Sequence, residues 1–298
     1  MRLCLGTAQL GMGYGIRGGA KPSLSAALSL LDIAVERGVD AMDTATAYGD
    51  AEAVLGRFFD SRPEVRDGVS VVSKFGMGVF DGAGRHEYPD RLRRAALESL
   101  ARIGKDRLYG YLCHVPDAVR NEAVISAMAE VRRAGLAEHV GFSVYEVDEA
   151  VSAINSGVVD LLQVPFSVFD QRMLCAGVLE MAARRGVEVH SRSAFVQGLA
   201  LMDVEEVPDW LPGARRLVAD LESLCAASGT TRRRLALAFV RRRGGISRLV
   251  FGVDGAVQLG EILDDFAASV PSQAIDEAER MFAEVDPRLV MPNKWRKQ

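Results

Sequence analysis

Residues 107–143, RLYGYLCHVPDAVRNEAVISAMAEVRRAGLAEHVGFS, contain two apolar runs separated by an amphipathic segment. The first run, 107–114, and the second, 138–143, have the length of β-strands. The segment between them, 121–134, has helical periodicity and ends at Gly135, a residue type that commonly follows a helix C-terminus. A strand, a helix and a strand in this order predict two parallel strands joined by a helical crossover.

The same alternation extends along the chain in both directions. Before this unit we predict strands at 39–43 and 69–74, with helices from about Ser23 to Gly38 and at 51–59 and 89–103. After it we predict strands at 161–165, 187–191 and 248–252, helices at 147–155, 172–185, 214–227, 231–242 and 256–266, and a long loop around 208–212. The apolar run 3–10 is a candidate first strand. Eight strands that alternate with helices predict a closed (β/α)8 TIM barrel with its active site at the C-terminal rim of the strands.

Length and composition agree with one such barrel. The chain has 298 residues, of which 49% are hydrophobic and 26% charged, which is typical of a globular protein. The length also fits two domains of about 150 residues. No segment rich in Pro, Gly or Ser divides the chain, so we predict a single domain over residues 1–298, with a C-terminal tail over about 286–298.

Charge and cysteine content exclude several classes of partner. With 36 Lys and Arg against 40 Asp and Glu, the net charge of −4 gives no field that would attract nucleic acid or an anionic membrane. The four cysteines are far apart and form no CxxC motif, which favours reduced thiols and a cytoplasmic location. We find no signal peptide, no apolar run near 18 residues and no metal-ligand spacing. The sequence leaves the oligomeric state open.

A glycine-rich stretch near the N-terminus, GYGIRG at residues 13–18, matches the dinucleotide-binding pattern GxGxxG. In that motif the glycines lead directly into a helix, whose N-terminus binds the pyrophosphate. Here residues 20–22 intervene, and Ser23 is the better N-cap. We therefore interpret this stretch as a loop at the barrel rim and keep a Rossmann domain as the weaker alternative.

Polar side chains follow three of the predicted strands at the point where each strand ends. The strand at 39–42 leads into DTATAYG at 43–49, the strand at 69–73 leads into Lys74, and the strand at 108–113 leads into His114. Each of these side chains alone has a common structural role, such as a cap or a snorkelling lysine. In this order they resemble the aldo-keto reductase superfamily, which implies a catalytic tetrad of Asp43, Tyr48, Lys74 and His114.

The resemblance implies a carbonyl reductase in which Tyr48 donates the proton. A tyrosine with a pKa of about 10 is a poor donor at neutral pH, and a neighbouring ammonium such as that of Lys74 lowers this pKa by about 1 to 3 units. Asp43 would keep Lys74 charged, and His114 would hydrogen-bond the substrate carbonyl. A positioned general acid contributes about 10² to 10⁴ in rate.

The resemblance also implies a nicotinamide cofactor, with NADP(H) as the family default and NAD(H) as an open option. The family's Leu-Gly-Thr element and its Gly-x-Ser are matched by LGTA at 5–8 and GFS at 141–143, although Val144 replaces the asparagine that commonly follows. Ser143 and Gln163 would hydrogen-bond the carboxamide of the nicotinamide. The complete set of expected cofactor residues is Ser143, Gln163, Ser191, Arg192, Gly198, Gly252, Val253, Gln258 and Glu261.

Two segments depart from the family pattern. The cations that bind the 2′-phosphate of NADP in the family align with the uncharged Gly252 and Gln258, and the nearby Arg232 or Arg233 could restore this contact. The segment SRSAFVQG at 191–198 lacks the tyrosine that stacks on nicotinamide, and Phe195 is the candidate substitute. This segment is similar to bacterial members associated with polysaccharide or other sugar biosynthesis.

The expected substrate is a small aldehyde or ketone, with a sugar-derived carbonyl as one candidate. Arg17 and Arg192 are the charged residues suited to a sugar phosphate or a carboxylate. Two alternatives remain at this stage. One is a non-catalytic regulatory or scaffold protein that keeps the cofactor site, and the other is a lyase in which Lys74 forms a Schiff base.

Overall fold

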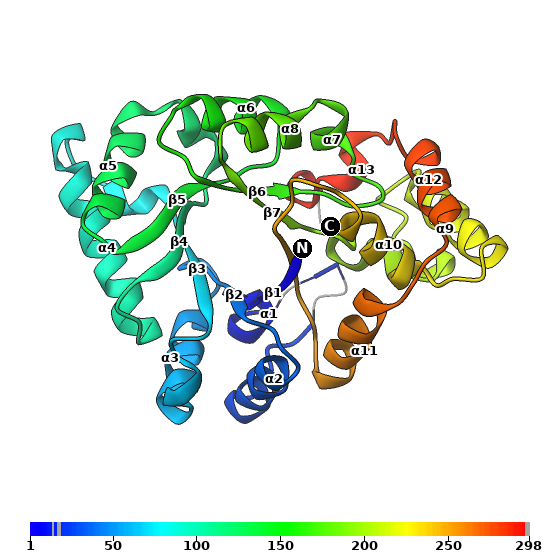
Figure 1. Cartoon of the computed structure of the whole chain (residues 1–298), viewed down its shortest axis with the longest axis horizontal. Helices are drawn as coiled ribbons and strands as arrows, with labels where there is room; N and C mark the ends of the chain where they lie inside the picture. Colours follow the sequence, from blue (N-terminus) through cyan, green and yellow to red (C-terminus); the bar gives the residue numbers. More distant parts are fainter. Residues whose placement is uncertain (14, 17–18, 296–298) are drawn as a thin grey trace.

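Parallel strands form a closed, eight-stranded barrel in the computed structural model, which describes residues 1–13, 15–16 and 19–295. The strands follow chain order around the barrel, and β1 pairs with β8 to close it, with Arg2 opposite Arg248 and Leu5 opposite Phe251. The predicted (β/α)8 fold is confirmed (Figure 1). The strands are β1 (Arg2–Gly6), β2 (Ala41–Asp43), β3 (Ser70–Phe75), β4 (Leu108–Cys113), β5 (Ala137–Ser143), β6 (Leu161–Pro165), β7 (Glu188–Arg192) and β8 (Arg248–Phe251).

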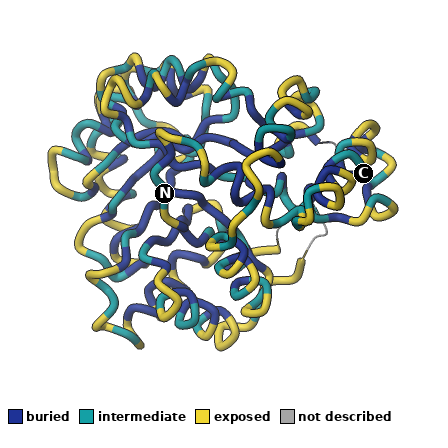
Figure 2. The backbone as a smooth tube through the Cα atoms, turned by 45° about the vertical axis from the view of Figure 1, so that its right-hand side comes forward, coloured by how far each residue is buried: buried dark blue, intermediate teal, exposed yellow. Residues whose placement is uncertain are grey.

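Helices surround the barrel, so that in Figure 2 buried backbone lies mostly along the strands and exposed backbone along the outer helices and loops. The α-helices are α1 (Ala8–Gly11), α2 (Leu24–Glu36), α3 (Ala51–Ser61), α4 (Tyr88–Ile103), α5 (Glu122–Arg133), α6 (Val147–Asn155), α7 (Arg172–Cys175), α8 (Val178–Arg184), α9 (Ala214–Ala227), α10 (Arg232–Arg241), α11 (Ala256–Ala267), α12 (Ser272–Met281) and α13 (Pro287–Val290). The 3-10 turns are η1 (Pro63–Val65), η2 (Met77–Phe80), η3 (Arg85–Glu87), η4 (Pro116–Arg120), η5 (Val196–Leu201), η6 (Val204–Glu206) and η7 (Pro292–Lys294).

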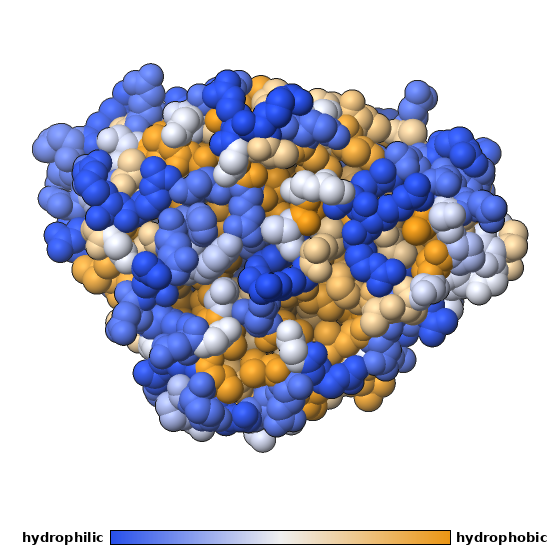
Figure 3. Space-filling view, in the orientation of Figure 1, coloured by the Kyte–Doolittle hydropathy of each residue, from blue (hydrophilic) through white to orange (hydrophobic). Residues whose placement is uncertain are grey.

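Helix α4 shows how these helices cover the sheet. Its buried residues Leu92, Ala96, Leu100 and Ile103 recur every three or four positions and therefore form one apolar face. Burying such a face removes apolar area from water at about 25 cal/mol per Å². Hydrophilic residues cover much of the periphery of the face shown in Figure 3, with apolar residues between them. In the described part of the chain, no helix is both long and apolar enough to cross a bilayer.

Two predicted elements are divided in the structure. The run 3–10 is not one strand, because the chain leaves the sheet after β1 at Thr7, whose backbone N–H donates to Asp43 O, and then forms α1. The predicted helix 172–185 is broken into α7 and α8 at Gly177, which has a positive φ of 68°. By contrast, Ser23 caps α2 as predicted, since its side chain accepts from Ala26 N at 3.2 Å.

The end of the chain is more ordered than a tail. Residues 286–295, within the expected tail at 286–298, contain α13 and η7, while residues 296–298 lie outside the described residues. Trp295 is buried, donates from Nε1 to Arg288 O at 3.1 Å and contacts the ring of Trp210 at 5.8 Å. This packing returns the C-terminal segment to the barrel rim, beside the residues that follow β5 and β7.

Candidate active site

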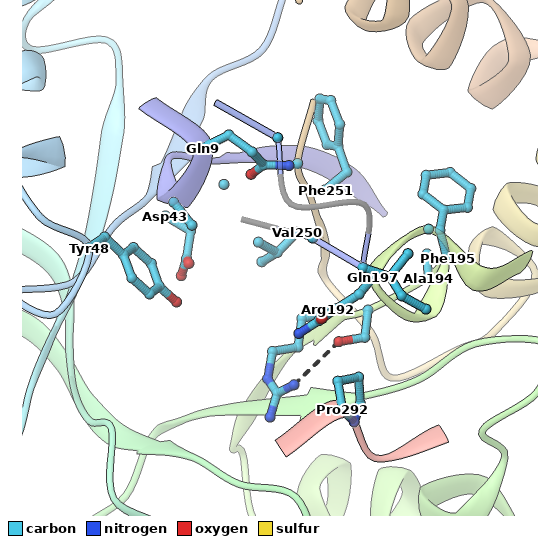
Figure 4. A pocket seen from close by; sticks show the side chains of 18 of the residues that line it. Gln9, Asp43, Tyr48, Arg192, Ala194, Phe195, Gln197, Val250, Phe251 and Pro292 are labelled. Carbon is cyan, nitrogen blue, oxygen red and sulfur yellow. Dashed lines mark hydrogen bonds between the residues drawn. The ribbon is translucent and has the colours of Figure 1, made fainter. Parts of the chain in front are cut away.

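A cavity of about 440 Å³ opens at the C-terminal end of the strands. Its walls come from residues in or after β1, β2, β4, β5, β6, β7 and β8, and from η7 (Figure 4). Three of the four residues of the expected tetrad, Asp43, Tyr48 and His114, line it directly. The position at the strand ends is where enzymes of this fold form their active sites.

Close packing of two glycines fixes the turn that bears Tyr48. Gly49 has a positive φ of 59°, and a Cβ at this position would lie 2.3 Å from Gly11 O. A Cβ on Gly11 would lie 1.8 Å from Tyr48 O, so α1 and the turn can approach only because both residues lack side chains. The phenol of Tyr48 therefore projects into the cavity from a backbone that α1 holds in place (Figure 4).

Lys74 lies beneath the cavity with no exposed surface. Its ammonium donates to Asp43 Oδ1 at 2.5 Å, to Thr44 O at 2.9 Å and to Tyr48 Oη at 3.4 Å. Burial opposes the charge, but attraction to Asp43 and Tyr48 outweighs it and raises the pKa of Lys74 above its ordinary value. The ammonium thus stays charged next to the phenol oxygen.

Asp43 joins this pair to two of the predicted carboxamide-binding residues. Its Oδ2 accepts from Gln163 Nε2 at 2.7 Å, and Gln163 Oε1 accepts from Ser143 Oγ at 3.2 Å. All three side chains are buried and contribute to the cavity wall, Asp43 and Ser143 as the last residues of β2 and β5 and Gln163 from within β6. One hydrogen-bonded chain therefore runs from Ser143 through Gln163 and Asp43 to Lys74 and Tyr48.

His114 is neutral at physiological pH. Burial, with a further contribution from the nearby charge of Lys74, lowers the pKa of His114 to about 4. Its backbone N–H is anchored to Phe75 O at 2.8 Å, and its ring meets the ring of Tyr48 edge-on at 5.6 Å. A neutral imidazole has one N–H, which is available to a carbonyl oxygen bound beside Tyr48.

The expected cofactor residues divide into two groups. Six of them line the cavity, namely Ser143, Gln163, Arg192, Gly198, Gly252 and Gln258. Ser191, Val253 and Glu261 do not line it. The Ser191 hydroxyl instead donates to Arg248 O at 3.4 Å between two strands, Val253 is packed in the core, and Glu261 accepts from Arg233 Nη1 at 2.9 Å.

The β8 side of the cavity has room for a cofactor backbone. A Cβ on Gly252 would lie 2.6 Å from the amide of Gln9, so the glycine keeps the space between β8 and α1 open. Gln258 Oε1 accepts from Asp254 N at 2.6 Å and closes the start of α11. Gln163 and Ser143 line the same cavity with uncharged polar side chains, and this set of residues is compatible with a nicotinamide nucleotide.

The loop after β7 has a constrained backbone. Ser193, Val196 and Gln197 have positive φ values of 65°, 49° and 56°. For a β-branched valine this conformation is a genuine outlier, and such strain persists only where the surrounding structure enforces it. Gln197 lines the cavity, and its buried Oε1 has no partner among the described residues.

Sequence reasoning missed several wall residues. Gln9 directly follows the LGTA element at 5–8 and Gln197 lies within the segment 191–198, but the sequence assigns no role to either side chain; Pro292 and Asn293 lie in the expected tail. Phe195, the candidate for stacking, lines the side of the cavity opposite Tyr48 (Figure 4). Arg17 lies outside the described residues. No group of three metal-ligating side chains occurs within the described ranges.

Comparisons with known proteins identify the family of the chain. The model of the aldo/keto reductase family matches residues 2–281, so the chain belongs to this family of oxidoreductases, which use nicotinamide cofactors. The NADH-specific methylglyoxal reductase of Escherichia coli K12 is 23% identical over 257 residues, covering 75% of this chain and 77% of that protein.

Two further relatives have narrower or purely structural similarity. The 6-dehydroglucose reductase of Novosphingobium aromaticivorans is 28% identical over 138 residues, which cover 43% of this chain and 44% of that protein. A Pseudomonas aeruginosa crystal structure assigned to the aldo-keto reductases has a TM-score of 0.66 at 23% identity, covering 92% of this chain and 90% of that one. This last similarity concerns the fold.

Proposed function

We propose that this protein is an NADH-dependent reductase of small aldehydes or ketones, with Tyr48 as general acid. The observation that supports the proposal most directly is the contact of a buried, charged Lys74 with the oxygen of Tyr48 at 3.4 Å, at the wall of an open cavity. A non-catalytic scaffold has no need of such an arrangement. Methylglyoxal and sugar carbonyls, the substrates named for two relatives, belong to the proposed class.

The side chains of the tetrad have distinct tasks in this proposal. The bound dihydronicotinamide supplies a hydride to the carbonyl carbon. Tyr48 donates its proton to the carbonyl oxygen, and the Lys74 ammonium stabilises the resulting phenolate. His114 donates a hydrogen bond to the same oxygen and orients the carbonyl, while Asp43 keeps Lys74 charged.

The charge pattern near α11 supports NADH rather than NADPH. Arg233 is held by Glu261 at 2.9 Å and by Asp265 at 2.5 Å, and Arg232 pairs with Asp203 at 3.1 Å. The two arginines that would have to bind a 2′-phosphate therefore already have carboxylate partners. A ribose hydroxyl can donate to the Glu261 carboxylate, whereas a phosphate would be repelled by it.

The lyase alternative is disfavoured by the same geometry. Schiff-base formation requires a neutral amine. Asp43 and Tyr48 hold Lys74 in its charged form, and its three donors are engaged with Asp43, Thr44 and Tyr48.

The test is a turnover assay with NADH and NADPH against a panel of aldehydes, ketones and sugars. We expect NADH to give the higher kcat/KM. Tyr48→Phe should lower kcat by about 10² to 10⁴, while NADH binding, followed by fluorescence, stays unchanged. Tyr88→Phe, which removes a hydroxyl outside the cavity wall, is the matched control. Full turnover by Tyr48→Phe would refute the assignment of the acid.

A further inference from the structure

Arg192 differs from other partly buried arginines of this chain in its partners. Arg248 is 9% exposed and holds Asp40 at 2.6 Å, and Arg172 is 17% exposed and holds Asp170 at 2.8 Å. Arg192 is also partly buried, yet it forms no ion pair with any carboxylate of the described residues. Because a desolvated charge is normally paired, this guanidinium is suited to an anion from outside the chain.

Neighbouring groups hold the guanidinium in a fixed plane. Arg192 Nη2 donates to Val144 O at 2.9 Å, Nη1 donates to Ser193 Oγ at 3.3 Å, and the guanidinium carbon lies 4.1 Å from the centre of the Tyr145 ring. Stacking and a backbone acceptor orient arginine well while leaving other N–H donors unused. The strained loop that begins at Ser193 keeps this position at the cavity wall.

Arg192 also dominates the charge of the catalytic half of the cavity. Among the described wall residues, it is the only lysine or arginine. The charge of Asp43 is balanced by Lys74, and His114 is neutral. Arg192 adds to the effects of burial and Lys74 that lower the pKa of His114, so its field reaches the site of proton transfer. Figure 4 shows it across the cavity from Tyr48, beside Pro292.

We propose that Arg192 binds an oxyanion of the substrate, so that the preferred carbonyl compound bears a carboxylate or a phosphate. The proposal rests on the proposed reductase function and specifies the substrate class of the same site. An arginine presents parallel N–H donors that match the oxygens of either anion. It would act as a specificity residue, because it orients the substrate through a group remote from the reacting carbonyl.

Matched pairs of substrates distinguish recognition of the anionic group from recognition of the carbonyl group. Butanal and succinic semialdehyde are four-carbon aldehydes of which only the second carries a carboxylate, and glyceraldehyde and its 3-phosphate form the corresponding phosphate pair. We expect wild-type enzyme to prefer the charged member of at least one pair. Arg192→Gln should lower kcat/KM for the charged member by about 10- to 100-fold more than for the neutral member. Arg192→Lys should retain part of the preference.

A binding measurement gives a readout that is independent of turnover. Calorimetric titration with 4-hydroxybutanoate and 1-butanol, the two alcohol products of the carboxylate pair, is carried out with enzyme saturated with the oxidised cofactor. Binding of the charged product should be lost in Arg192→Gln. Arg215→Gln is the matched control, since Arg215 is 52% exposed and pairs with Asp209 away from the cavity.

The outcomes distinguish the two proposals. Equal losses for charged and neutral substrates, together with weaker NADH binding, would assign Arg192 to the cofactor and overturn the inference. A wild-type enzyme without preference in either pair would also overturn it. Failure to reduce any carbonyl would refute the proposed function, and selective binding of 4-hydroxybutanoate through Arg192 would then still support an anion site. Selectivity for one pair identifies the anion as carboxylate or phosphate.

Discussion

The two ends of the barrel both contain networks of hydrogen-bonded polar side chains, and they differ in whether the network lines the cavity. At the N-terminal end, the Glu188 carboxylate accepts from Tyr109 Oη at 2.5 Å and from Ser247 Oγ at 2.6 Å, and it contacts His190 Nε2 at 2.9 Å. At the C-terminal end, the network around Lys74 instead faces a cavity.

This difference supports the proposal that the buried charges facing the cavity have a role in function. Burial raises the pKa of Tyr109, with help from Glu188, while hydrogen bonds from His190, Ser247 and Tyr109 outweigh burial and lower the pKa of Glu188 to about 2. The pKa values of these groups are shifted as well, yet the groups are hydrogen-bonded to one another and none of them lines the cavity. A perturbed pKa identifies a catalytic group only where the group also meets a space for substrate.

Breaking the Asp43–Lys74 ion pair should have the largest effect on stability and on turnover. Lys74→Met leaves Asp43 as a buried carboxylate without its cation, which should cost about 3 to 5 kcal/mol of unfolding free energy and abolish turnover. The double variant Asp43→Asn, Lys74→Met should regain most of the stability and none of the activity. Urea denaturation and kcat measure the two effects. Turnover by the double variant would contradict the roles assigned to this pair.

Breaking the N-terminal network should affect stability alone. The folded-state pKa of Glu188 lies below its ordinary value of 4.5, so its stabilisation is present above pH 4.5 and is lost as the pH falls toward 2. Glu188→Gln should therefore cost about 2 to 3 kcal/mol at pH 7 and less in acid, with kcat/KM unchanged. A fall in kcat/KM of the folded variant would show that the two ends are coupled.

His114 should make the active-site end sensitive to acid. Its folded-state pKa of about 4 is below the ordinary 6.5, so the unfolded chain binds the proton first and stability falls as the pH drops from 6.5 to 4. His114→Asn should remove about 2 kcal/mol of this loss. Melting temperatures of the wild type and the variant at pH 7 and pH 4.5 test this prediction. Equal acid sensitivity of the two proteins would contradict it.

His139, at the N-terminal end, should give a smaller effect of opposite sign. Pairing with Asp160 raises the pKa of His139, so its stabilisation is present below the ordinary pKa of 6.5 and is lost as the pH rises through the higher folded value. His139→Asn should cost up to about 1 kcal/mol at pH 5.5 and almost nothing at pH 9. A loss of stability in His139→Asn that grows with pH would contradict the raised pKa of His139.

Much of the fold and of the site was accessible from the sequence for one geometric reason. Parallel strands present their C-terminal ends at a common rim, so polar residues at successive strand ends, such as Asp43, Lys74 and His114, must converge once the barrel is recognised. The caps and breaks of the helices are also local signals, as Ser23 illustrates.

The remaining features depend on contacts between distant segments. Side chains alternate along β7, so Arg192 faces the cavity while Ser191 beside it does not. Glu261 forms an ion pair with Arg233 of the preceding helix, and the ring of Trp295 packs against that of Trp210. No local pattern encodes such pairings, and the break at Gly177 resembles the glycines that end other helices.

The pairing of β1 with β8 also determines when the cavity can form during synthesis. Its two strands are the first and last of the barrel in chain order, so they can pair only after all eight strands have been synthesised. The Asp43–Lys74 pair comes from early strands, whereas Gly252 and the wall residues of η7 come last. During synthesis, the polar side chains of the early strands therefore lack part of the cavity wall until these later residues have been added.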